Sequence, residues 1–141
     1  MKLGIFGSAV LLGLSGVTGM AFAQAQTDAG KQEYEWHCAI CHGESGRGDG
    51  EMRKFLTTAP ADLTQISKRN GGTFPNQLIW DIIDGRAATE AGAHGTREMP
   101  VWGQRYRQEA MADPGGAAAP EWAVRNRIVA LLDYLSRIQE K

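Results

Sequence analysis

Cysteine and histidine are scarce in this sequence, which has two cysteines and three histidines in 141 residues. A structural zinc site takes four ligands, typically from two cysteine-containing corners, and the two cysteines here form a single corner. The charges are nearly balanced, with 15 Lys and Arg against 16 Asp and Glu. Because non-specific binding of nucleic acid needs a basic surface, this balance excludes DNA and RNA as partners.

The sequence also lacks the patterns of a β-sheet protein and of a repeat protein. No segment alternates apolar and polar residues over the length of a strand, and no internal repeat is present. Helical signals are present instead: one helix beginning at Thr27 and Asp28, a second from Pro75 to Gly85, and a long amphipathic helix over 121–139. These patterns predict an all-α fold with three main helices in one domain.

Two long, glycine-containing loops separate the expected helices. The first begins with four glycines in Gly43–Gly50 and continues to Gly72, and the second runs over 86–98. Loops longer than about 12–15 residues are uncommon in a compact domain unless they serve a function. We therefore expect a large bound group that the loops surround, with the glycines letting the backbone pass close to it. A further connection over 113–120 is expected at the surface.

The first 23 residues have the order of a Sec-type signal peptide. Lys2 precedes an uncharged, apolar stretch over 3–23, and this stretch ends in the small-residue pattern Ala21-Phe22-Ala23. We predict cleavage after Ala23, which leaves residues 24–141 as a single domain. The alternative is an uncleaved membrane anchor, since the stretch approaches the roughly 20 residues that span a bilayer. Export would place the two cysteines in an oxidising compartment.

The segment Cys38-Ala39-Ile40-Cys41-His42 has three interpretations. A Cys-x-x-Cys redox motif usually lies in a strand–helix–strand setting, and no strand is expected here. A zinc corner would need a second corner. In the third interpretation the segment is the C-x-x-C-H attachment motif of haem c, in which both thiols bond to the haem vinyl groups and the histidine binds the iron. This interpretation uses Cys38, Cys41 and His42 together and supplies the group that the loops surround.

A second axial ligand for such an iron is expected at the end of the second loop. Met99 is followed by Pro100, which stiffens the backbone and keeps the methionine out of a helix. Met52 follows the first ligand too closely to cross to the opposite face. His94 is the main alternative, because two histidines can also ligate haem iron. Met99 would otherwise be a core thioether, and His37 is expected to be a partly exposed histidine.

These motifs resemble those of class I bacterial cytochromes c. The segments Cys38–His42 and Met99–Gly103 stand where that family has its haem attachment motif and its axial methionine, and the resemblance extends over about residues 27–138. It implies the cytochrome c fold, with three main helices and long loops wrapped around one covalent haem c. It also implies that a glycine lets the two terminal helices approach. Matching positions in these helices are Gly30, Tyr34, Cys38, Leu131, Tyr134 and Leu135.

The resemblance also implies further residues at the haem. The stretch 59–64 is similar to a segment in which a proline carbonyl accepts a hydrogen bond from the haem-ligating imidazole. Such a bond fixes the imidazole and raises its basicity. Pro60 is expected in this role and Trp102 among the residues that contact the haem, while the iron ligands implied are His42 and Met99.

From this resemblance we expect a periplasmic mono-haem cytochrome c, a one-electron carrier between respiratory or dehydrogenase complexes and not an enzyme. Its redox partners would bind transiently, and the protein would be a monomer with no membrane span once the leader is cleaved. One alternative is a haem enzyme, or the haem subunit of a periplasmic oxidoreductase, with an open iron site where His94 and Arg97 serve a peroxidase-like reaction. Another is an exported thiol–disulfide protein.

Overall fold

A computed structural model describes residues 28–86, 99–112 and 121–141, and these residues are helical with no strand among them. In chain order the elements are α1 (Ala29–His37), α2 (Ala39–His42), the 3₁₀ helices η1 (Glu51–Phe55) and η2 (Leu63–Gln65), α3 (Ile66–Arg69), α4 (Asn76–Asp84), α5 (Trp102–Ala112) and α6 (Glu121–Arg137). The prediction of an all-α chain is confirmed over the described residues.

Helices α1, α4 and α6 lie where the sequence predicts the three main helices. Helix α5 was not predicted; it follows directly on the Met99 segment and is longer than α1 or α4. The first predicted loop also contains short helical turns, among them η1, η2 and α3. The chain therefore has more regular structure around the candidate site than its composition indicates.

The ends of α1 and α4 follow local chemistry. The N-cap of α1 is Asp28, whose carboxylate accepts a hydrogen bond from the backbone N–H of Lys31 at 3.0 Å. Pro75 directly precedes the first helical residue of α4. Gly85 ends α4 with a left-handed φ of 86°, a conformation that glycine adopts at low cost. The predicted end of this helix is confirmed.

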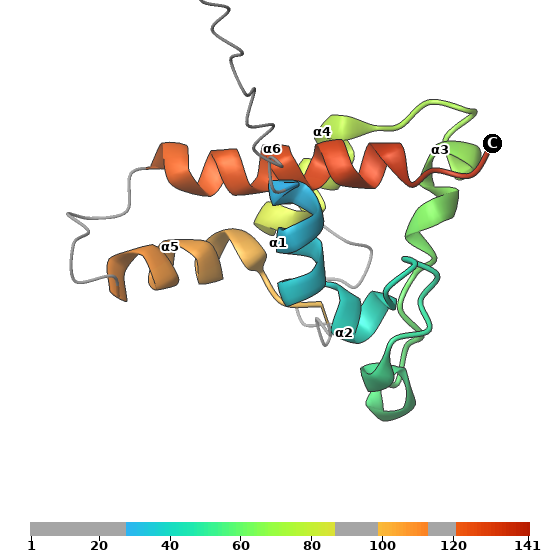
Figure 1. The fold of residues 1–141 in the computed structure, drawn as a ribbon, viewed down its shortest axis with the longest axis horizontal. Coiled ribbons are helices and arrows are strands. Elements are labelled where there is room, and N and C mark those ends of the chain that lie inside the picture. The colour runs from blue at the N-terminus through green and yellow to red at the C-terminus, as the bar shows by residue number, and fades with distance from the viewer. Residues whose placement is uncertain (1–27, 87–98, 113–120) are drawn as a thin grey trace, which may run out of the picture.

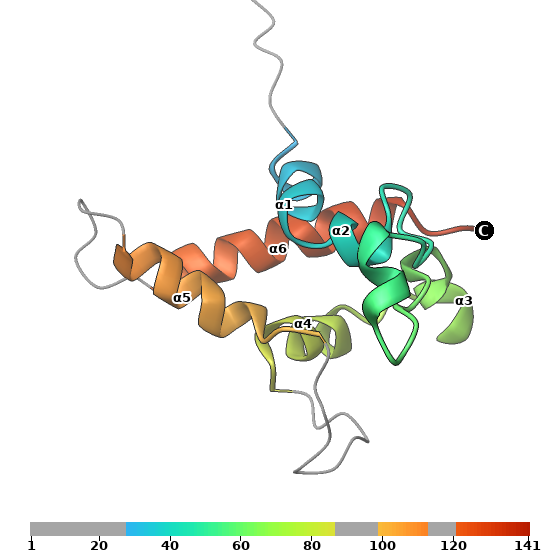
Figure 2. The same cartoon turned by 90° about the horizontal axis from the view of Figure 1, so that it is seen from below.

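Helix α1 crosses α6 at close range (Figure 1). A Cβ added to Gly30 would lie only 2.1 Å from the carbonyl oxygen of Ala130, so a glycine is needed where the two helices meet. Tyr34 is fully buried beside this crossing, with its ring 5.1 Å from that of Tyr134. Figure 2 shows α1 and α4 on opposite sides of α6. The expected approach of the two terminal helices through a glycine is confirmed.

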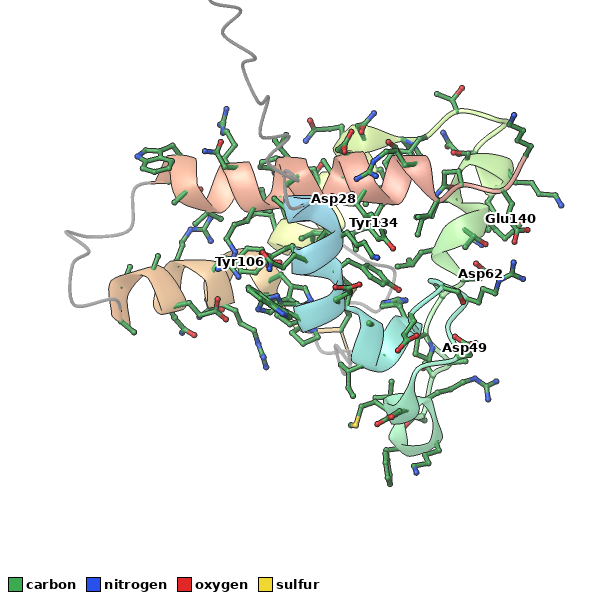
Figure 3. All side chains as sticks on the ribbon, viewed as in Figure 1. Asp28, Asp49, Asp62, Tyr106, Tyr134 and Glu140 are labelled. Carbon is green, nitrogen blue, oxygen red and sulfur yellow. The ribbon has the colours of Figure 1, made fainter. Side chains whose placement is uncertain are left out.

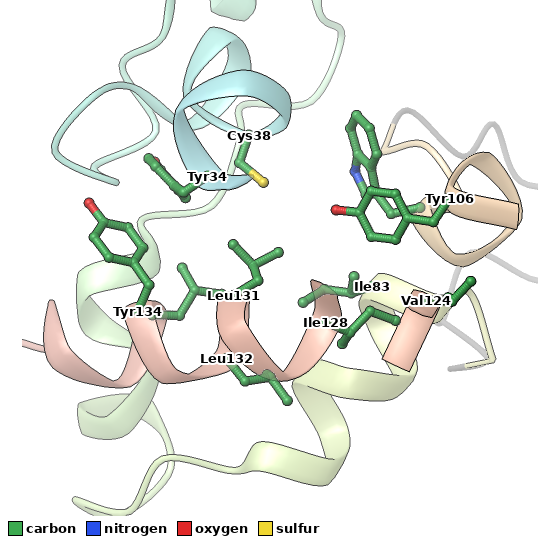
Figure 4. Packing of buried hydrophobic residues seen from close by; sticks show 11 residues of the cluster. Tyr34, Cys38, Ile83, Tyr106, Val124, Ile128, Leu131, Leu132 and Tyr134 are labelled. Atoms are coloured by element: carbon green, nitrogen blue, oxygen red, sulfur yellow. The ribbon is translucent and has the colours of Figure 1, made fainter. Parts of the chain in front are cut away.

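The hydrophobic core is built around α6 and is completed by side chains from α1, α4 and α5 (Figure 4). The buried cluster consists of Tyr34, Cys38, Ile83, Trp102, Tyr106, Val124, Ile128, Leu131, Leu132, Tyr134 and Leu135. Because Cys38 is part of this cluster, the cysteine segment is anchored directly on the core. None of the helices in the described part of the chain is long and apolar enough to cross a membrane.

Candidate functional site

One helical turn brings the two cysteines and the adjacent histidine together. The backbone N–H groups of Cys41 and His42 both donate to the carbonyl of Cys38, at 3.1 and 2.8 Å. Cys38 is buried where α1 gives way to α2, Cys41 is half-buried, and both are free thiols. Burial, followed by the nearby Glu33 and Cys41, raises the pKa of Cys38 to about 12. The Cys38 thiol is therefore protonated at neutral pH.

A backbone carbonyl orients the imidazole of His42. Its Nδ1 lies 2.9 Å from the carbonyl oxygen of Ala61, and because a carbonyl can only accept, Nδ1 carries the proton. Nε2 then keeps its lone pair, which is the form of histidine that binds a metal. Burial lowers the pKa of His42, and the hydrogen bond to Ala61 partly opposes this. The neutral imidazole is therefore favoured, so two thiols and one metal-binding nitrogen fit the attachment of a haem.

The carbonyl that accepts from His42 is that of Ala61 and not that of Pro60, which the resemblance implied. The Pro60 carbonyl instead faces Gly48, where an added Cβ would lie 2.3 Å from its oxygen. Consecutive carbonyls of a non-helical segment point to different sides, so only one of them faces the imidazole. The expected acceptor is thus corrected by one residue.

The glycine-rich loop Gly43–Gly50 folds back onto α2. The N–H of Gly48 donates to the carbonyl of His42 at 2.8 Å. A Cβ on Gly50 would lie 2.5 Å from the carbonyl oxygen of Ile40. The sequence predicted that these glycines let the backbone approach a bound group. In the structure, Gly48 and Gly50 approach the protein's own backbone closely, and backbone hydrogen bonds hold the loop against the His42 turn.

Met99 and the residues after it lie against the end of α4. Met99 is partly buried and packs on the core cluster. A Cβ on Gly85 would lie 2.4 Å from Cγ1 of Val101, so the valine packs directly on the turn that ends α4. A Cβ on Gly103 would lie 1.9 Å from Oδ1 of Asp84, so this glycine packs directly on the carboxylate. These contacts fix the backbone on the C-terminal side of Met99.

Trp102 packs in a group of aromatic rings between the Met99 segment and α1. Its ring centroid lies 5.1 Å from that of His37 and 5.9 Å from that of Tyr106. The His37 side chain is only 16% exposed, and its Nδ1 lies 2.9 Å from a carboxylate oxygen of Glu33. His37 is thus partly exposed, as the sequence predicted. Through this ring contact, Trp102 connects the Met99 segment to the residue that precedes Cys38.

A cluster of charged residues beside these rings was missed by the sequence analysis. Arg127 of α6 donates to both carboxylate oxygens of Glu33, at 3.1 and 2.9 Å, and to Glu109 of α5 at 2.8 Å. Its guanidinium lies 3.9 Å over the ring of Tyr106, which projects from α5 toward α1 (Figure 3). The sequence could have indicated this cluster through Glu33, which directly precedes Tyr34, because a carboxylate on a buried part of a helix requires a partner.

Several predicted features fall outside the residues that the structure describes. These are the signal peptide over 1–23, the alternative site residues His94 and Arg97, and the connection over 113–120. Among the candidates that are described, the structure brings Cys38, Cys41 and His42 together on one turn. Met99 lies just before α5, and Trp102 is the first residue of that helix.

Comparison with known proteins adds one finding. The family model described as Cytochrome c matches residues 27–127 of the chain. This range contains the cysteines, His42, Met99 and all of helices α1 to α5. No curated protein and no solved structure matches the chain significantly.

Proposed function

The chain belongs to the cytochrome c family, whose members bind covalently attached haem c and carry electrons, and we propose that it is a class I bacterial member with one haem. The helical structure agrees with the cytochrome c fold. The observation that carries the proposal is the turn Cys38–His42, where two free thiols precede an imidazole whose Nε2 lone pair is available.

In the proposed site, Cys38 and Cys41 would hold the haem through thioether bonds and His42 would bind its iron through Nε2. When bound, the haem would supply a metal that takes up and releases one electron. The Ala61 carbonyl keeps the proton on Nδ1 of His42, orients the ring and raises its basicity as a ligand. The lowered pKa of His42 keeps the imidazole unprotonated at neutral pH.

We assign the second axial position to Met99. A methionine ligand favours the reduced state and raises the redox potential relative to two histidines. The packing of Val101 on Gly85 supports this assignment, because it holds the backbone near Met99 in one position. With His42 and Met99 both bound, the protein would carry electrons without an open site for substrate. Trp102 is kept as a proposed haem-contacting residue, while the role expected of Pro60 passes to Ala61.

The proposed location is the periplasm, after cleavage of the leader over 1–23, and the proposed form is a monomer. The support is the order of a basic residue, an apolar stretch and an Ala-x-Ala end in the sequence. In that compartment the protein would carry single electrons between respiratory or dehydrogenase complexes. Contacts of this kind are small and transient.

The test is the visible and far-red spectrum of the haem-loaded protein, oxidised and reduced, and the response of the reduced form to carbon monoxide. We expect a low-spin spectrum, the weak far-red band of a methionine–iron bond and no binding of carbon monoxide. Met99→Ala should keep the haem covalently attached, lose the far-red band and bind carbon monoxide. The band should disappear because the other axial position then has no sulfur ligand.

Two methionines provide matched controls, since Met52 and Met111 are 37% and 61% exposed. Met52→Ala and Met111→Ala should both retain the far-red band. If Met99→Ala kept the band, the axial assignment would be wrong, and His94→Ala would be the next variant to test. Rapid binding of carbon monoxide to the wild type would indicate an open iron, and the function would then be that of a haem enzyme with His94 and Arg97 near the metal.

A further inference from the structure

Asp84, the last residue of α4, is a buried carboxylate at an unfavourable position. Its side chain is only 2% exposed. The C-terminus of a helix carries a partial negative charge that repels an anion, and burial of an unpaired charge is costly. An acidic residue at this position therefore requires cationic partners, and the structure supplies two.

Both partners of Asp84 are arginines, and one of them continues to a third helix. Arg107 of α5 donates to Oδ1 of Asp84 at 3.3 Å, and Arg86 contacts Oδ2. Arg107 also binds both carboxylate oxygens of Glu121, the first residue of α6, at 3.1 and 3.0 Å. The hydrogen bond to Glu121, followed by charges that include Asp84, raises the pKa of Arg107. The chain Asp84–Arg107–Glu121 thus joins the ends of α4 and α6 through α5.

The Met99 segment lies directly against this charged chain. A Cβ on Gly103 would lie 1.9 Å from Oδ1 of Asp84, and a Cβ on Gly85 would lie 2.4 Å from Cγ1 of Val101. The first turn of α5 therefore rests on the carboxylate, while Val101 rests on the next residue of α4. Met99 is two residues before Val101, so a shift of this contact would move its backbone.

We propose that Asp84 is a positioning residue for the axial methionine. Through its contact with Gly103 and its ion pair with Arg107, the carboxylate fixes the beginning of α5 against α4 and so would hold Met99 at the iron. This inference rests on the proposed role of Met99. A buried ion pair is often no more stabilising than an apolar replacement, so fixing the geometry of this segment is the stronger reason for a charge here.

The test uses the haem-loaded ferric protein and imidazole as the probe, because imidazole binds the iron only when the methionine leaves it. Asp84→Asn keeps the shape of the side chain and removes its charge. We expect its affinity for imidazole to rise about tenfold, a typical magnitude for coupling between two sites. Its far-red band should also be lost at a lower temperature than in wild type.

Two further variants separate positioning from general stability. Asp133→Asn also removes an acidic partner of an arginine, but that arginine is Arg137, four residues later on the same helix α6, and the aspartate is exposed. This control should leave the affinity for imidazole unchanged. Glu121→Gln weakens the ion pair between Arg107 and the exposed Glu121. It should also raise the affinity for imidazole, by a smaller factor than Asp84→Asn. It also serves as the test if Asp84→Asn does not fold.

The outcomes distinguish this inference from the function on which it rests. If the wild type shows no far-red band, or if its band survives in Met99→Ala, both the assignment of Met99 as iron ligand and the role of Asp84 are wrong. If the band is present and Met99-dependent, but Asp84→Asn and Glu121→Gln bind imidazole as wild type does, only the role of Asp84 is overturned. The same conclusion follows if Asp133→Asn raises the affinity as much as Asp84→Asn.

Discussion

Gly30 provides the most direct test of how α1 packs on α6, because a single methyl group disturbs it. In Gly30→Ala the new Cβ would lie 2.1 Å from the carbonyl oxygen of Ala130 and 2.9 Å from Cβ of Tyr134. Neither atom can rotate away. Overpacking a core typically costs about 1–3 kcal/mol, whereas alanine gains up to about 1 kcal/mol over glycine in a helix. Because the clash is with backbone, we expect a net loss of about 2 kcal/mol.

The assay is thermal unfolding of the haem-loaded protein, followed by far-ultraviolet circular dichroism. In a domain of this size, a loss of about 2 kcal/mol lowers the melting temperature by roughly 6–10 °C. Gln32 is exposed on the same helix, so Gln32→Ala and Gln32→Gly measure the helix preference alone, and alanine should be the more stable. Wild-type stability of Gly30→Ala would refute the reasoning, because it would show that α1 and α6 do not meet at this glycine.

Three other perturbations test individual contacts. Tyr34→Phe removes the hydroxyl that donates to the carbonyl of Gly43 at 2.5 Å, and urea unfolding should show a loss of about 1–3 kcal/mol; an unchanged midpoint would contradict the contact. Arg127→Lys keeps the charge, but a lysine cannot bind both oxygens of Glu33 as the guanidinium does, so the melting temperature should fall. A melting temperature equal to that of wild type would show that the paired hydrogen bonds are dispensable. The pKa of Asp28 is lowered by the backbone N–H that it caps and then by an arginine of α6, so the unfolded state binds more protons and stability falls below about pH 4. Asp28→Asn keeps the helix cap and should make the loss of stability at low pH smaller. The same dependence of stability on pH as in wild type would contradict this.

Helix α6 could be predicted because it buries an apolar face at helical spacing, whereas α1 and α4 were indicated in part by residues at their ends, such as Asp28 and Gly85. In α6 the predicted positions Val124, Ile128, Leu131 and Leu135 are buried, and Ile138, the residue after the helix, is partly buried. Helix α5 could not be predicted in this way, since its buried residues are confined to its first half, at Trp102, Gly103 and Tyr106. The rest of α5 has no repeating apolar face, so packing of its beginning against α1, α4 and α6 determines the helix.

The candidate site was predictable where its residues are contiguous and not where they meet through the fold. Cys38, Cys41 and His42 form a local motif, and their spacing alone indicates haem attachment. The partner of His42 is a backbone carbonyl 19 residues away, at Ala61, and no side-chain type signals it. Asp84 likewise depends on arginines and glycines that only the folded chain brings together. The sequence therefore indicated the Cys38–His42 turn better than the groups that hold it in place.

Those holding groups also connect the two sides of the proposed haem site. His37 directly precedes Cys38, Trp102 follows Met99 closely, and their rings meet edge-on with centroids 5.1 Å apart. Arg127, on α6, binds the carboxylate of the same α1 that carries His37, and it also reaches α5. Each side therefore rests on the other and on α6. A displacement of α1 from α6 should loosen the methionine side as well, because Met99 and Trp102 pack on the same hydrophobic cluster as residues of α1 and α6.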